Sequence, residues 1–244
     1  MAHVALSRLD HRPWPIPARP WTWRQSWRDL LFAHWAVPAA ILRPLVPRSL
    51  ELQEVEGTAW LGLVPFRMTG VMRRPLPDLP WISAFPELNV RTYVNLDGKP
   101  GIWFLSLDAS NALAVWVARR FFHLPYYRAS MNLIGNGNAL RYSSVRAGAE
   151  FLASYGPTSD FYHAKPGSLE HWLTERYCLY AMAPDGSIWR NEVQHLPWPL
   201  QAAKATFDRN TMFSFHGIAM PEPPALLNFA KRLDVVIWDA ERAA

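Results

Sequence analysis

A strand, a turn and a second strand follow one another between residues 85 and 108, and this pattern limits the fold more than any other feature of the chain. The segment FPELNVRTYV alternates polar with mostly apolar side chains, and its polar members are Glu87, Asn89, Arg91 and Tyr93. Because successive side chains of a strand point to opposite faces, these four groups share one face. Asp97 and Gly98 follow as a hairpin turn signal, and IWFLSLD is predicted to be a covered central strand.

The rest of the chain also reads mainly as short strands joined by turns. The predicted strands are 27–36, 58–71, 149–156, 176–182, 187–196 and 233–239, with a hairpin around GNGN within 132–145. The predicted helices are 39–46, 111–122 and 169–175, with a further helical piece near Ala202. Ser110 or Asn111 is expected to cap the second helix and Ser168 the third. Pro65 indicates a bulge in its strand or an edge position.

This order of elements predicts an α+β fold that is mainly antiparallel β, with the sheet curled into a barrel or a sandwich and a few helices covering it. The 22 prolines and 12 glycines are spread along the chain, which suits short strands and turns. Residues 1–26 are rich in Pro, Trp and Arg, and we expect them to form an arm that is laid over the body by its tryptophans. Residues 27–244 show no repeat or linker and are predicted to be a single domain.

Composition and charge narrow the classes of partner. The net charge of +5 is dispersed, without a polybasic run, so we do not expect nucleic acid to be bound. The longest apolar tract is interrupted by His34, Pro38 and Arg43, so no membrane span is expected, and no signal-peptide pattern is present. The single cysteine, Cys178, fits a reducing compartment. We therefore predict a soluble cytoplasmic protein.

Several familiar chemistries lack their motifs in this chain. There is no GxSxG nucleophile elbow, no P-loop and no HExxH, and GNGNAL lacks the third glycine of a dinucleotide-binding loop. The eight histidines include no pair at close metal-ligand spacing, although His34, His195 and His216 could converge in space. No metal and no cofactor are therefore predicted.

Five motifs together form a specific series: ELNVRTYV, GKPGIWFLSLDA, an arginine-bearing helix followed by LPY, LTERYCLY and HLPWPLQ. From Trp27 to Trp238 the chain resembles the bacterial family of YqjF-like proteins, known as domain of unknown function 2071. That family is grouped with the acetoacetate decarboxylase-like fold, which implies an antiparallel sheet wrapped into a cone-shaped barrel around an internal cavity. The family has no agreed activity.

The more distant resemblance to acetoacetate decarboxylase implies roles for single residues. Arg28 falls where the decarboxylase has a cavity arginine, Glu87 falls near its glutamate, and Arg119 matches an arginine of its helix. The position of its Schiff-base lysine, however, falls on Tyr126. Schiff-base chemistry needs an amine, and a phenol cannot form an imine. Of the four lysines only Lys204 could substitute, so acetoacetate decarboxylase activity itself is not expected.

These observations lead to a hypothesis about the site. The chain is predicted to be an enzyme or binding barrel for a small organic acid or carbonyl compound, with acid–base chemistry of a lyase or isomerase type and without a Schiff base. The expected catalytic residues are Glu87, Tyr126 and Arg28. The expected substrate-binding residues are Arg91, Asn89, Arg119 and His195.

Other interpretations stay open from the sequence. Glu87 and Arg91 could form a solvated pair on an outer strand. Arg176 next to Glu175 reads as a structural ion pair or cap, and His195 as the anchor of a turn. Finally, the barrel could be non-catalytic and bind a protein partner, or a second copy of itself as a homo-oligomer, through the tryptophan-rich arm.

Overall fold

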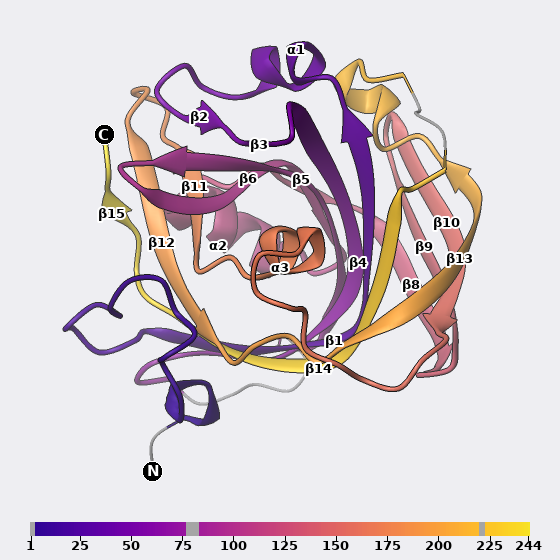
Figure 1. The fold of residues 1–244 in the computed structure, drawn as a ribbon, viewed down its shortest axis with the longest axis horizontal. Coiled ribbons are helices and arrows are strands. Elements are labelled where there is room, and N and C mark those ends of the chain that lie inside the picture. Colours follow the sequence, from indigo (N-terminus) through magenta and orange to yellow (C-terminus); the bar gives the residue numbers. More distant parts are fainter. Residues whose placement is uncertain (1–2, 77–82, 220–222) are drawn as a thin grey trace.

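The computed structural model of the protein describes residues 3–76, 83–219 and 223–244, and one continuous hydrogen-bonded sheet dominates it (Figure 1). Its longer strands are β1 (Trp23–Val37), β4 (Thr58–Arg73), β5 (Phe85–Leu96), β6 (Lys99–Ala109), β10 (Ala149–Pro157), β13 (Leu200–Asn210) and β14 (Leu226–Ile237). The others are β2 (Glu51–Leu52), β3 (Glu54–Val55), β7 (Tyr126–Arg128), β8 (Ser130–Asn136), β9 (Ala139–Arg146), β11 (Cys178–Met182), β12 (Ile188–His195) and β15 (Glu241–Arg242). The α-helices of the described ranges are α1 (Ala39–Leu42), α2 (Ala112–Phe122) and α3 (Leu169–Thr174).

The sheet closes on itself through a pairing between strands that are far apart in its linear order. The path β12-β11-β6-β5-β4-β1-β14 is hydrogen-bonded throughout, and β14 also pairs with β12 through Val193 opposite Ile237. All neighbours on this path are antiparallel except β6 and β11, which run parallel. Figure 1 shows α2 and α3 inside the outline of this ring. The structure confirms a mainly antiparallel fold with a few helices.

A second layer of strands covers one side of the ring. β8, β9 and β10 pair with one another and join the ring through β13, as seen at the right of Figure 1. The outward residues Leu63 and Val90 of the ring pack against Tyr142 and Phe151 of this layer in one core. A separate core, which includes Phe66 and Leu107, lies within the ring. Both faces of the covered ring strands are therefore buried.

Strand β5 illustrates the consequence of this arrangement. Leu88 and Val90 point into the core between the layers, whereas Glu87, Asn89 and Arg91 point to the interior of the ring. Both Glu87 and Asn89 are buried. The polar face of this strand therefore borders an internal space and not bulk water.

Several turns and helix caps lie where the local sequence predicted them. Asp97 and Gly98 both have positive φ, as a type I′ hairpin turn requires, and they join β5 to β6. Asn111 caps α2 by accepting from two backbone N–H groups, and Ser168 caps α3. The bulge or edge position expected at Pro65 is wrong, because β4 lies between β1 and β5 and pairs with β5 there without a register shift, and the irregularity lies instead in β1, between Arg28 and Ala33.

The helical piece predicted near Ala202 is wrong. Residues 200–210 form strand β13, whose side chains alternate between half-buried and exposed over much of its length. The segment LQAAKATF has good helix formers, but β13 completes hydrogen bonding to both β10 and β14. Tertiary pairing therefore overrides local propensity here.

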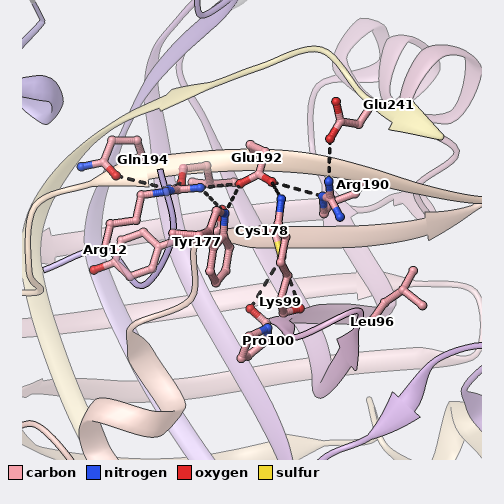
Figure 2. A network of polar contacts seen from close by, with 12 residues as sticks. Arg12, Leu96, Lys99, Pro100, Tyr177, Cys178, Arg190, Glu192, Gln194 and Glu241 are labelled. Atoms are coloured by element: carbon pink, nitrogen blue, oxygen red, sulfur yellow. Dashed lines mark hydrogen bonds and ion pairs between the residues drawn. The ribbon is translucent and has the colours of Figure 1, made fainter. Parts of the chain in front are cut away.

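The N-terminal segment packs against the ring through polar and aromatic side chains, and Figure 2 shows its Arg12 beside Glu192 and Gln194. Arg12 is buried and forms an ion pair with Glu192 of β12, and Trp14 donates its indole N–H to the same carboxylate at 2.8 Å. Trp21 is buried in a small core with Trp238. β1 begins at Trp23. Because Trp14 and Trp21 are engaged within the chain, this packing does not favour partner binding through the arm.

Candidate ligand-binding cavity

The ring encloses a cavity of about 200 Å³. β1, β4, β5, β6, β11 and β12 supply its wall, and α2 and α3 add further residues. Most of the lining side chains are apolar or aromatic, and the polar ones that concern the chemistry are Glu87, Asn89, Arg91, Tyr126, Arg176 and His195. A space of this kind, apolar with a few polar groups, is typical of a small-molecule site.

Glu87 and Tyr126 form the central polar pair of the cavity. Glu87 is only 2% exposed, and the Tyr126 hydroxyl donates a hydrogen bond of 2.8 Å to its Oε2. The Asn89 amide lies at 3.5 Å from Oε1. The two residues meet because their strands lie on either side of β6. After α2 the chain forms β7 beside β6, with Tyr126 opposite Leu107. On the other side of β6, Glu87 of β5 pairs with Ala109.

The environment of Glu87 changes its acidity. Burial raises its pKa from 4.5 to about 8, and the hydrogen bonds from Tyr126 and Asn89 offset only part of this effect. Burial and the neighbouring carboxylate raise the pKa of Tyr126 well above its usual value, so Tyr126 stays protonated. Among the described residues Glu87 forms no ion pair. It can therefore gain or lose a proton near neutral pH, which is what a general acid–base needs.

Two arginines lie together at another part of the wall. The guanidinium carbons of Arg91 and Arg176 lie 5.7 and 5.1 Å from the centre of the same ring, that of Tyr93. Neither arginine forms an ion pair with a carboxylate of the described residues. The Nε of Arg91 and one terminal nitrogen of Arg176 are buried without a hydrogen-bond partner. Two unneutralised guanidiniums with free donors favour an anionic ligand.

Arg176 is held from behind by backbone and side-chain oxygens. Its Nε donates to the Trp172 carbonyl at 2.8 Å and its Nη1 donates to Gln53 at 2.7 Å. Burial lowers its pKa to about 10, so it still carries its charge at neutral pH. Of the two structural roles that the sequence suggested for Arg176, the helix cap is present, because Arg176 binds the Trp172 carbonyl in the last turn of α3. The ion pair with Glu175 is not, because Glu175 instead accepts from the Tyr177 hydroxyl and the Trp198 backbone N–H. No pattern in TERY indicated that Arg176 would point into a cavity.

His195 lines the cavity, and both of its ring nitrogens lie near backbone carbonyls, of which the neutral ring, with its single N–H, donates to one. Nδ1 lies 2.8 Å from the carbonyl of Leu196 and Nε2 lies 3.3 Å from that of Arg176. The ring stacks on Tyr177, and burial lowers the His195 pKa, which favours the neutral form. The contacts of His195 thus fit a residue that fixes the backbone next to Arg176.

Arg28 and Arg119 lie outside the cavity lining. Along β1 the neighbour Trp27 faces the cavity, so Arg28 points to the other face, where its Nε donates to Thr69 at 3.2 Å. On α2, Ala114 and Ala118 face the cavity with helical spacing. The guanidinium of Arg119 lies 5.6 Å from the ring of Tyr127 instead.

The part of the chain that the structure describes lacks three other kinds of feature. None of the four lysines lines the cavity: Lys99 pairs with Glu192 at 3.2 Å, and Lys165, Lys204 and Lys231 are exposed. No group of three or more His, Cys, Asp and Glu there is arranged to hold a metal ion. No helix in these ranges is long and apolar enough to cross a membrane.

The closed ring and its internal cavity define a protein of the acetoacetate decarboxylase-like fold. The enduracididine biosynthesis enzyme MppR, in complex with pyruvate, matches with a TM-score of 0.64 at 13% identity, over 93% of this chain and 91% of that one. An acetoacetate decarboxylase from Legionella pneumophila matches with a TM-score of 0.63 at 13% identity, over 100% and 98% of the two chains. At these identities the likeness concerns the fold alone.

Sequence similarity identifies the family within this fold. A family model described as an uncharacterized conserved protein, domain of unknown function 2071, matches residues 24–234. The uncharacterized protein YqjF of Bacillus subtilis (strain 168) is 47% identical over 234 residues, which cover 95% of this chain and 96% of that protein. The chain therefore belongs to this family of YqjF-like proteins, as its motifs predicted.

Proposed function

We propose that this protein binds a small organic acid that contains a carbonyl group and performs acid–base chemistry on it without forming an imine. The observation that carries the proposal is the buried Glu87, which is hydrogen-bonded to Tyr126 and forms no ion pair with any residue that the structure describes. A buried carboxylate without a cation destabilises the folded state. Such an arrangement is typical of a functional site.

The geometry supports a proton transfer in which the two residues act in turn. The Glu87 carboxylate takes a proton from the carbon next to the ligand carbonyl, and the electron pair of that C–H bond moves onto the carbonyl oxygen. Tyr126 has one hydroxyl hydrogen, which it donates to Glu87 in the free protein. Once Glu87 is protonated, Tyr126 can donate to the developing enolate oxygen instead. In a ligand whose enolate is conjugated with a C=C bond, return of the proton to the far carbon of that bond, with the electron pair of the oxyanion reforming the carbonyl, would complete an isomerisation.

The fold neighbours support the ligand class. The matched MppR structure holds pyruvate, and a second one holds the condensation product of pyruvate and imidazole 4-carboxaldehyde. Both are carbonyl-derived acids of the kind that Arg91 and Arg176 would attract. The resemblance aligns Tyr126 with the Schiff-base lysine, and none of the four lysines, which all lie in the described ranges, lines the cavity.

Binding of short oxo acids tests the proposal. Replacing Arg91 with Gln is expected to raise the Kd of pyruvate or acetoacetate about 10- to 100-fold, because a hydrogen bond to a charged group contributes roughly 1.5–3 kcal/mol. Arg176→Gln should act in the same direction. Arg28→Gln is the matched control, since Arg28 lies on the other face of β1 and should leave the Kd unchanged. Isothermal titration calorimetry measures all four proteins. Equal affinity in wild type and Arg91→Gln would contradict the role of Arg91.

Reductive trapping tests the absence of an imine. Incubation with pyruvate or acetoacetate and borohydride is expected to leave the mass of the protein unchanged in intact mass spectrometry, because no lysine of the chain lines the cavity. An adduct of one ligand mass that is located on a lysine would overturn this part of the proposal. A Schiff-base enzyme treated in parallel serves as the positive control.

A further inference from the structure

A second apolar space continues from the cavity along the outer side of α2. This groove has a volume of about 650 Å³. The residues that line both it and the cavity are Trp23, Val71, Phe85, Ala114, Val117 and Phe122. Among them Trp23 and Phe122 meet edge to face with their ring centres 5.4 Å apart. The groove and the cavity are therefore adjacent and share these six side chains as lining.

The groove exposes large apolar side chains to solvent. Leu113 and Phe121 of α2 are 50% and 58% exposed, and Leu76 beyond β4 is 61% exposed. Apolar residues that border a pocket in this way mark a binding surface more often than isolated ones do. Because α2 also turns Ala114 and Ala118 toward the cavity, it presents apolar groups to both spaces.

Residues of strand β5 line both the cavity and the groove, in the order of the sequence. Arg91 lies toward one end, Asn89 and Glu87 follow, and Phe85 lies where the cavity meets the groove. Arg91 lies six positions after Phe85, which is roughly 20 Å along an extended strand. A short acid such as pyruvate would occupy only a fraction of this length.

We propose that the natural ligand is an elongated amphiphilic acid. Its acidic head lies at Arg91 and Arg176, its reactive carbonyl faces Glu87, and its apolar chain passes Trp23 and Phe122 into the groove beside α2. This inference rests on the proposed function and adds the substrate class to it. The continuity of the groove with the cavity assigns it to the tail of a ligand and not to a protein partner.

A series of straight-chain carboxylic acids with four to twelve carbons, used below their micelle-forming concentrations, tests this inference by calorimetry. The Kd is expected to fall by about fourfold for each added methylene while the chain fills the groove. Phe121→Glu should remove this dependence on chain length and leave the Kd of butanoate unchanged. Phe161→Glu is the matched control, because Phe161 is 70% exposed but lines neither space, and it should keep the dependence.

Each of the other possible outcomes contradicts this inference, and the last one contradicts the proposed function as well. If short acids bind in an Arg91-dependent way but the Kd does not vary with chain length, the groove is not a subsite and only the proposed function stands. If Phe161→Glu removes the dependence as Phe121→Glu does, or if Phe121→Glu keeps it, the chain does not lie beside α2. If no acid of any length binds, the proposed function and this inference both fail.

Discussion

The Glu87→Gln variant is expected to gain stability relative to wild type as the pH rises from 5 to 8. In wild type the folded-state pKa of Glu87 is raised to about 8 from 4.5. A group whose pKa is higher in the folded state contributes stability at low pH and loses it as the pH rises, because the unfolded chain releases its proton first. Glu87 therefore costs wild type roughly 3 kcal/mol more at pH 8 than at pH 5.

Glutamine removes this cost without removing the hydrogen bond. Its side-chain oxygen can still accept from Tyr126, and its shape matches that of a protonated glutamate, so the variant should fold. Urea unfolding of both proteins at several pH values measures the difference directly. All other titrating groups, including the buried Asp108, are common to the two proteins, so their contributions to the pH dependence cancel in the stability difference. A stability difference that stays constant between pH 5 and 8 would show that Glu87 has an ordinary pKa.

The Arg12→Met variant is expected to lose about 3 kcal/mol of unfolding free energy, because removal of one partner from a buried ion pair leaves the other buried charge with less compensation. Figure 2 shows how Arg12 joins the N-terminal arm to Glu192 and Gln194 of β12 and to the backbone of Tyr177. The side chains of Arg12 and Glu192 are 1% and 2% exposed. Lys99 and Arg190 also contact Glu192, so its charge keeps partial compensation in the variant.

For a chain of this length the expected loss corresponds to a decrease of roughly 6–12 °C in Tm, which differential scanning calorimetry resolves. Arg19→Met is the control, since Arg19 is half-exposed and forms one pair with Glu241 at 3.4 Å. Surface pairs of this kind contribute under ~1 kcal/mol, so the Tm of the control should hardly move. If the Tm of Arg12→Met equals that of Arg19→Met, Arg12 does not anchor the arm.

The sequence predicted the strand pattern well where the signal was local. The alternation from Glu87 to Tyr93 and the turn at Asp97 and Gly98 depend on neighbouring residues, and the structure has both. It did not predict which space the polar face borders, because that depends on the closure of the ring through β12 and β14 and on the layer over its outer side. β13 was missed for the same reason, since its partners lie far away in the chain.

The site was predictable only in part. Glu87, Asn89 and Arg91 share a strand face, and the resemblance pointed to the position of Tyr126, so these four residues could be placed in one cavity. The resemblance to a distant enzyme pointed to Arg28 and Arg119 as cavity residues. In the structure their neighbours Trp27 and Ala118 line the cavity, and the two arginines do not. Arg176 could not be foreseen. It lies between α3 and β11, where no regular period indicates the direction of a side chain.

The ionisation of Glu87 is the central claim, and one titration tests it most directly. Carbon-13 NMR of protein labelled at the glutamate carboxyl, compared with the Glu87→Gln variant, assigns the resonance of Glu87. We expect a midpoint of about pH 8 for this resonance, with a shift of the midpoint when a short oxo acid is added. A midpoint near 4.5, unchanged by any such acid, would contradict a cavity built for acid–base chemistry.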